Sequence, residues 1–145
     1  MNKNIDKARN PNTPVKILKE LAKDEKRYVR WRAAGNPSTS PKVLVELAKD
    51  QNCGVSRRLV AKNPNTPPVA LMELAKDEDR GVREGVAWNI NTPTKLLVEL
   101  AKDEYWGVRW KVAGNPSTPV KVLKKLSKDE NRYVRDEVTK NPLLV

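Results

Sequence analysis

An arginine and an aspartate recur at a fixed distance along this chain. Arg30, Arg83, Arg109 and Arg135 each follow a valine directly and an aspartate by six residues, whereas Ser56 interrupts the series. A row of guanidiniums could bind phosphate groups. The fixed spacing favours another arrangement, a ladder in which the arginine of one repeat pairs with the aspartate of a neighbour, because guanidinium and carboxylate groups pair in a bidentate way.

Few other groups in the chain could do chemistry. The sequence contains no histidine and a single cysteine, Cys53. Histidine is the commonest general base and metal ligand, so the sequence predicts no metal site and no cofactor. No nucleophile is recognisable next to a base, and we therefore expect no enzymatic activity.

The charged residues belong to an internal repeat of about 26 residues. In each of the first five copies, two leucines follow a turn asparagine by 8 and 11 residues, and a valine follows it by 19. The second copy has one extra residue, which this valine spacing places within residues 56–59. The asparagines are Asn10, Asn36, Asn63, Asn89, Asn115 and Asn141, and the valines are Val29, Val55, Val82, Val108 and Val134.

Each repeat is predicted to form two short helices. The first is expected to begin at a Thr-Pro step such as Thr13-Pro14, with threonine as the N-cap and proline at the first helical position. The second is expected to begin near an aspartate such as Asp24, which would cap it, and to end where asparagine precedes proline. Helices this short are marginal alone, so the repeats must stack.

The sequence therefore predicts an all-α fold, an α-solenoid of five tandem helix-pair repeats that forms a single domain over residues 1–145. Residues 1–9 are interpreted as the tail of a degenerate helix. The apolar residues Leu143, Leu144 and Val145 could cover the last repeat or form a dimer contact, and a monomer is favoured.

The pattern N-P-x-T-P-x-x-x-L-x-x-L-A-x-D-x-x-x-x-V-R-x-x-V-A resembles the leucine-rich repeat variant family, and its second half is similar to HEAT-like repeats. The resemblance extends from Asn10 to Pro142. It implies a superhelical scaffold for interactions without implying one particular function. Members with an iron–sulfur cluster carry a Cys-rich segment that residues 1–9 lack. The resemblance implies a 3₁₀ turn in the second helix. The period of about 26 residues is slightly longer than the usual period of the family, so it leaves room for an α-helical turn at that place.

The net charge of +11 could indicate nucleic-acid binding. However, the third repeat holds more acidic than basic residues, so no continuous basic stripe follows the solenoid. Much of the excess is lysine on the first helices, which we expect to form a solvated convex face. These residues are Lys16, Lys19, Lys23, Lys42, Lys49, Lys76, Lys102, Lys121, Lys124, Lys125 and Lys128.

Residues that do not recur lie on one stripe of the second helix. Positions two before, two after and six after the core valine point away from the core. All four tryptophans fall there, and Cys53 is expected on the same surface. The predicted site consists of Arg27, Trp31, Arg57, Arg80, Glu84, Trp88, Trp106, Trp110, Arg132 and Asp136.

Second helices line the concave surface of HEAT-like solenoids, and tryptophan and arginine are enriched at binding hot spots. The stripe therefore predicts a non-enzymatic scaffold that recognises a protein or peptide partner. Two alternatives remain: the tryptophans could fill space between helices in a core without phenylalanine, or the solenoid could bind nucleic acid, as HEAT-like DNA-repair proteins do. No signal peptide or membrane-spanning stretch is visible, so we expect a cytoplasmic protein without a membrane partner.

Overall fold

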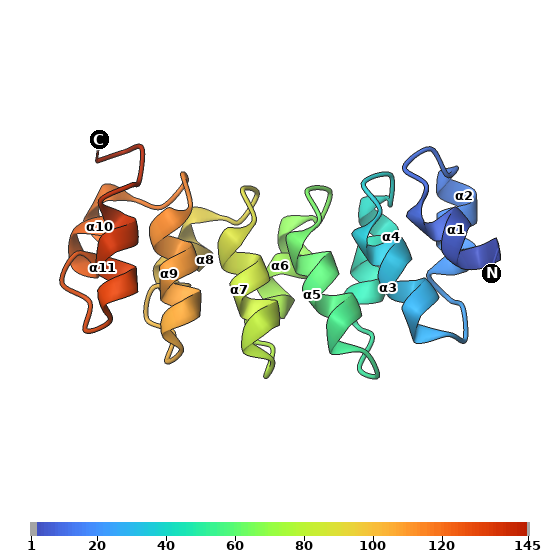
Figure 1. Cartoon of the computed structure of the whole chain (residues 1–145), viewed down its shortest axis with the longest axis horizontal. Helices are drawn as coiled ribbons and strands as arrows, with labels where there is room; N and C mark the ends of the chain where they lie inside the picture. Colours follow the sequence, from blue (N-terminus) through green and yellow to red (C-terminus); the bar gives the residue numbers. More distant parts are fainter. Residues whose placement is uncertain (1–2, 145) are drawn as a thin grey trace.

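The computed structural model describes residues 3–144, and this part of the chain contains eleven helices and no strand. The helices are α1 (Lys3–Arg9), α2 (Val15–Leu21), α3 (Arg27–Gly35), α4 (Pro41–Ala48), α5 (Gly54–Lys62), α6 (Pro68–Leu74), α7 (Arg80–Trp88), α8 (Thr94–Leu100), α9 (Trp106–Gly114), α10 (Val120–Leu126) and α11 (Arg132–Val138). Figure 1 shows them as a row of helix pairs with the two termini at opposite ends. The predicted all-α solenoid of five repeats is confirmed, and α1 packs on α3 as a preceding inner helix would.

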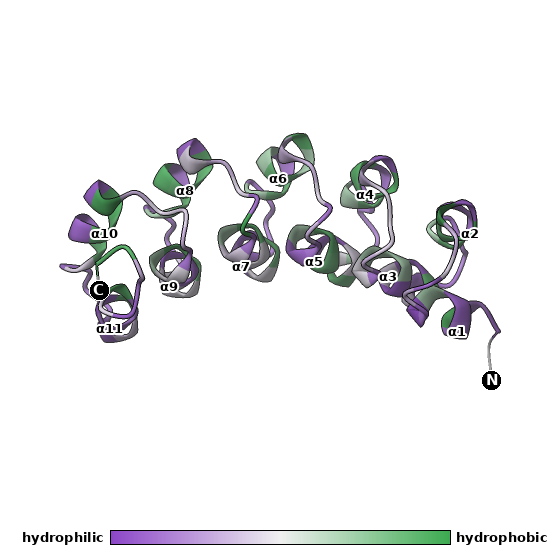
Figure 2. Ribbon diagram, turned by 90° about the horizontal axis from the view of Figure 1, so that it is seen from above, coloured by the Kyte–Doolittle hydropathy of each residue, from purple (hydrophilic) through white to green (hydrophobic). Residues whose placement is uncertain are grey.

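The helices form two curved layers. Figure 2 shows α2, α4, α6, α8 and α10 on the outer arc, and α1, α3, α5, α7, α9 and α11 on the inner arc. Each inner helix packs extensively on the next, whereas successive outer helices contact one another little. Gly85 of α7 allows a close approach, because an added Cβ would lie 2.8 Å from the Cβ of Ala61 on α5. The inner layer is therefore the shorter one, and its surface is concave.

Aliphatic side chains form the core between the layers. One leucine of every outer helix is fully buried, as are the core valines of four inner helices. The inner helices are α-helical, including the turn in which the resemblance implied a 3₁₀ conformation. The buried leucines are Leu18, Leu44, Leu71, Leu97 and Leu123, and the buried valines are Val29, Val82, Val108 and Val134.

The turn asparagines connect successive repeats. The amide of Asn89 donates hydrogen bonds to the carbonyl oxygens of Ala61 and Asn63 in the preceding repeat, at 2.8 and 3.0 Å, and its side-chain oxygen accepts from the N–H of Asn91. Asn36, Asn63, Asn115 and Asn141 repeat this arrangement. Each of these asparagines therefore bonds both its own turn and the preceding repeat.

Asn89 also shows that proline is not needed to end an inner helix. Ile90 follows it, yet its φ and ψ are −66° and 125°, close to the −74° and 125° of Asn115, which precedes a proline. The expectation that proline alone excludes asparagine from the helix is therefore incomplete. The side-chain bonds of the asparagine hold the same extended conformation in both places.

Two of the predicted N-caps are wrong. Pro14 is the N-cap of α2, and the hydroxyl of Thr13 instead donates to the carbonyl oxygen of Lys7. The equivalent threonines Thr39, Thr66, Thr92 and Thr118 likewise bond a carbonyl of the preceding inner helix. Asp24 is not the N-cap of α3, which is Lys26; the carboxylate accepts a hydrogen bond from the N–H of Lys26 within the loop. Both residue types brace the connections between helices.

The register predicted for the second repeat is wrong by one residue. Ser56, and not Val55, occupies the core position of α5, and the side chain of Val55 is 43% exposed. The extra residue lies in the loop between Asp50 and Gly54. An insertion inside the helix would rotate every later side chain by about 100°, whereas a loop absorbs it. Cys53 is the N-cap of α5 and is buried, so its predicted place on the concave surface is also wrong.

The apolar tail does not seal the last repeat. Leu143 and Leu144 remain 50% and 42% exposed, and Val145 lies outside the described residues.

Replacing Ser56 by valine is expected to stabilise the protein by about 1–2 kcal/mol. The Ser56 hydroxyl is fully buried and has no hydrogen-bond partner among residues 3–144, and four other repeats accommodate valine at this position. Chemical denaturation monitored by circular dichroism would measure the change. Ser56→Ala, which removes the hydroxyl without filling the space, should give an intermediate gain. A loss of stability in Ser56→Val would contradict the assigned register.

Replacing Asn89 by alanine is expected to destabilise the protein by about 2–3 kcal/mol, because two buried carbonyl oxygens each lose a hydrogen bond. Asn10→Ala is the matched control. Asn10 occupies the same place in its turn, but its side-chain N–H groups have no partner in residues 3–144, so its removal should cost under about 1 kcal/mol. Equal losses in the two variants, measured by denaturation, would show that the asparagines act only within their own turns.

Candidate functional site

The arginine–aspartate ladder lies at the opposite end of the inner helices from the asparagines. Arg83 Nε donates to Asp103 of the next repeat at 2.7 Å, and Arg83 Nη1 donates to the carbonyl oxygen of Asp77 in its own repeat. The other rungs are Arg30–Asp50, Arg57–Asp77 and Arg109–Asp129, at 2.9, 2.6 and 2.8 Å. The predicted ladder is confirmed for Arg30, Arg83 and Arg109, whereas Arg135 in the last repeat bonds the carbonyl oxygens of Asp129 and Glu130. Because these guanidiniums are bonded within the solenoid, they do not form a row of free phosphate-binding groups.

The electrostatics of the last rung show why the ladder stays charged. Burial raises the pKa of Asp129, but hydrogen bonds from Arg109 and from the backbone N–H of Asn131 outweigh burial. The pKa of the Asp129 carboxyl is therefore held below its ordinary value. The hydrogen bond to Asp129 in turn raises the pKa of Arg109, and the pair is ionised at neutral pH.

Arg57 belongs to this ladder and not to the concave stripe, where the sequence analysis placed it. Its side chain is 14% exposed and bonds both carboxylate oxygens of Asp77. The one-residue shift of the second repeat brings Arg58 to the stripe in its place, and Arg58 is exposed.

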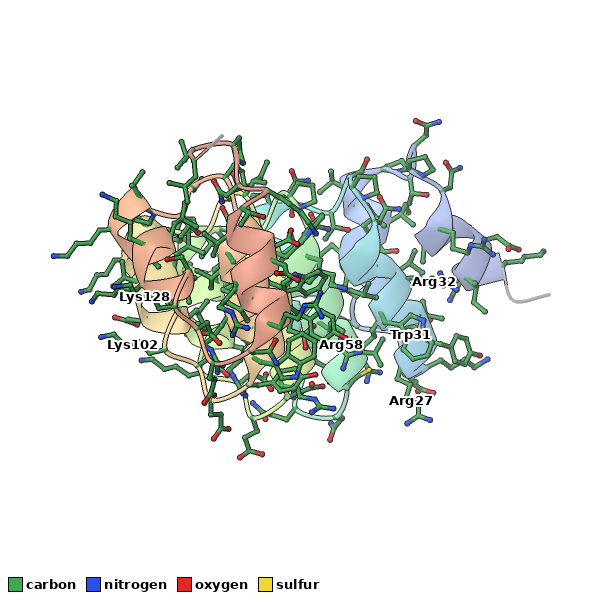
Figure 3. The ribbon with its side chains drawn as sticks, turned by 60° about the vertical axis from the view of Figure 1, so that its left-hand side comes forward. Arg27, Trp31, Arg32, Arg58, Lys102 and Lys128 are labelled. Carbon is green, nitrogen blue, oxygen red and sulfur yellow. The ribbon has the colours of Figure 1, made fainter. Side chains whose placement is uncertain are left out.

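The other predicted site residues lie on the inner helices as expected. Arg27, Arg80, Trp88, Arg132 and Asp136 are exposed. Trp31, Glu84, Trp106 and Trp110 are half-buried. Figure 3 shows Arg27, Trp31, Arg32 and Arg58 on the side of the inner helices, and Lys102 and Lys128 on the side of the outer helices.

Aromatic side chains gather where α9 packs on α11. The rings of Trp106 and Tyr133 are 5.5 Å apart, and those of Tyr105 and Trp106 are 5.7 Å apart. The indole N–H of Trp110 donates to Glu137 at 3.0 Å, and Lys111 lies 4.1 Å from the centre of the Trp110 ring. The contacts of Trp106 with Tyr133 and of Trp110 with Glu137 cross from one repeat to the next and hold the tryptophans in place.

Two hollows open on either side of Trp110, each with a volume of about 250 Å³. Trp106 and Tyr133 line one hollow, and Trp88 and Ile90 line the other. Trp88 and Ile90 are 53% and 63% exposed, and together they place apolar surface at the edge of this hollow. Trp106 and Trp110 contact the core, so part of each side chain fills space between helices. Trp88 is mostly exposed and does not have this role.

The N-terminal half of the concave face is basic. Arg9, Trp31, Arg32 and Leu59 line a third hollow, of about 240 Å³. Among residues 3–144, the guanidiniums of Arg27 and Arg32 have no hydrogen-bond or ion-pair partner, and Figure 3 shows both near Trp31.

Sequence reasoning missed several residues of these surfaces. Tyr133 stands one residue before the core valine, a position filled by glycine in α7 and α9, so the stripe is wider than the three positions considered. Glu137 and Arg32 stand three residues after the core valine. The one available signal was that these positions, like the tryptophan positions, differ from repeat to repeat.

The lysines predicted for the convex face are all exposed. The part of the chain covered by the structure holds no cluster of His, Cys, Asp and Glu suited to a metal ion. Within that same range, no helix combines the length and the apolar character required to cross a membrane.

Comparisons with family models and with curated proteins find no match for this sequence. Solved structures do resemble it. A leucine-rich repeat variant with a novel repetitive structural motif is 25% identical and superposes with a TM-score of 0.67, over 89% of this chain and 51% of that one. The Escherichia coli protein YibA is 21% identical, with a TM-score of 0.63 over 86% and 56% of the two chains.

A designed armadillo repeat protein is 15% identical, with a TM-score of 0.54 over 94% of this chain and 88% of its own. This chain spans about half the length of the leucine-rich repeat variant and of YibA. The chain is therefore a helical-repeat protein, an α-solenoid of the kind formed by leucine-rich repeat variant and HEAT-like proteins.

Proposed function

We propose that this protein is a non-enzymatic scaffold that binds an extended segment of another protein along the concave face of its inner helices. One observation carries the proposal. All four tryptophans, which do not recur from repeat to repeat, lie on the inner helices, and hollows open beside them.

The residues that recur have structural partners. The turn asparagines bond the preceding repeat, the threonines bond the preceding inner helix, and the ladder arginines bond aspartates. These recurrent residues therefore maintain the solenoid, and few of their polar groups remain available to hydrogen-bond a ligand. Functional capacity remains with the variable side chains of the concave face, where tryptophan and arginine are residue types that dominate binding energies.

Nucleic-acid binding is supported less well. Net charge and the tryptophans fit it, but Glu84, Asp136 and Glu137 lie on the same inner helices and would repel a phosphate backbone that follows the face. Many of the lysines lie on the outer helices instead. The charge of a protein segment can vary along its length, so such a segment meets fewer repulsive contacts on the concave face than a phosphate backbone does.

Selection from a random peptide library displayed on phage tests the proposal. The wild-type protein is expected to enrich peptides, and the affinity of a selected peptide should fall about 30-fold or more in Trp106→Ala/Trp110→Ala, since even one hot-spot tryptophan contributes about 2 kcal/mol or more. Trp88→Ala, at a mostly exposed position, should also weaken binding without changing the melting temperature. Lys102→Ala/Lys128→Ala on the convex face is the matched control and should bind as wild type does.

Two results would contradict the scaffold. Peptides could bind the wild type and the tryptophan variants equally. Alternatively, the protein could select no peptide and bind single-stranded oligonucleotides with an affinity that falls steeply with salt.

A further inference from the structure

The concave face differs in charge between its two halves. The inner helices α3 and α5 present Arg27, Arg32, Arg58 and Lys62, all of them exposed. Arg58 has only a solvated contact with Asp79, at 3.3 Å with both side chains at least 32% exposed. Such contacts are weak. This half therefore offers cationic groups that a partner can engage without breaking a strong internal ion pair.

The other half offers apolar surface in a hollow that polar groups border. Glu137 accepts from the indole of Trp110 at 3.0 Å and from Lys140 at 3.3 Å, and Asp136 pairs with Arg132 at 3.4 Å. The hollow bounded by these groups is walled mainly by Trp106, Trp110 and Tyr133. Its volume of about 250 Å³ lies below the roughly 300–1,000 Å³ of sites that enclose a small-molecule ligand. An apolar side chain is the occupant that suits it.

Between the two halves, α7 carries charge of both signs. Arg80 lies 4.3 Å from the centre of the Tyr105 ring, where it already has an aromatic partner, and Glu84 follows on the same stripe. A ligand with the same negative charge along its whole length would meet favourable groups on α3 and α5 but mixed charge on α7 and α11, where Glu84, Asp136 and Glu137 lie near Arg80, Arg132 and Lys140. A ligand whose acidic groups are confined to one end would place them against the exposed cations of α3 and α5.

On the basis of the proposed function, we infer the chemistry of the partner. It is an extended protein segment that carries aspartate or glutamate side chains at one end, against α3 and α5, and a large apolar side chain at the other, in the hollow between α9 and α11. The guanidiniums of Arg27 and Arg32, which are exposed and have no partner within residues 3–144, recognise the acidic end. Trp106, Trp110 and Tyr133 hold the apolar anchor by burial and ring contacts.

The sequences of peptides selected from the random display library test this inference. Wild-type protein should select peptides in which Asp and Glu are enriched toward one end and Leu, Phe or Trp toward the other. Arg27→Glu/Arg32→Glu, at two exposed positions without partners among residues 3–144, should lose that acidic preference. It should bind a wild-type-selected peptide about tenfold or more weakly, measured by fluorescence anisotropy at low salt.

Lys102→Glu/Lys128→Glu makes the same change of net charge on the convex face and should leave both the selection and the affinity unchanged. Selected peptides without an excess of acidic residues, or equal losses in the two charge variants, would overturn the inference while leaving the scaffold in place. A protein that enriches no peptide over its Trp106→Ala/Trp110→Ala variant would contradict the scaffold itself, and the inference with it.

Discussion

The amide of every turn asparagine from Asn36 onward reaches two carbonyl oxygens of the preceding repeat, and the rest of the solenoid depends on this contact. Carbonyl groups at the end of a helix have no partner within the helix, and burial makes that deficit costly. Asn36 satisfies the carbonyl oxygens of Ala8 and Asn10 in this way, and Asn141 does the same for Ala113 and Asn115 at the other end of the chain. Because the amide is short, it fixes how closely one inner helix approaches the next.

A second row of polar contacts acts at the other end of the same helices. There, the ladder arginines join the aspartate loops of successive repeats, and in the first step the amide of Asn4 bonds Asp24 instead. Hydrogen bonds and ion pairs thus hold both ends of each inner helix to its neighbour. The core between the inner and outer layers is built from small aliphatic side chains. Successive outer helices contact one another little, apart from an exposed ion pair of Lys23 with Glu46 at 4.0 Å, and they lie on the convex side of the stack. The frame thus produces a concave face whose own side chains are free to differ.

Much of this frame could be predicted from the sequence. The spacing of leucine and valine identified the helix pairs and their buried faces, and the constant distance between aspartate and arginine identified the ladder. The reach of asparagine and threonine to the preceding repeat could not be derived, because a local pattern of turn residues looks the same whether or not it bonds a neighbour. In the second repeat, Val55 matched the valine spacing by coincidence. The presence of Arg57 seven residues after Asp50, instead of six, was the sign that the insertion precedes the helix.

The candidate site could also be predicted only in part, because contacts within one repeat follow from the sequence pattern and contacts between repeats do not. Helical geometry places Trp88 and Trp106 on one surface of the solenoid. The contacts of Tyr133 with Trp106 and of Glu137 with Trp110 arise only when α11 packs on α9, so no pattern within one repeat indicates them. Arg58 was missed because the register was shifted by one residue.

The central claim is that recurrent residues maintain the frame and variable residues of the concave face bind. A scan of single substitutions, measured both for protease resistance and for binding of a selected peptide, tests it most directly. The account predicts that changes at Asn63, Thr92 and Arg83 lower resistance, whereas changes at Trp88, Arg27 and Arg32 leave resistance intact and weaken binding. It would be contradicted if Trp88, Arg27 and Arg32 proved as important for resistance as the recurrent residues, or if their replacement left binding unchanged.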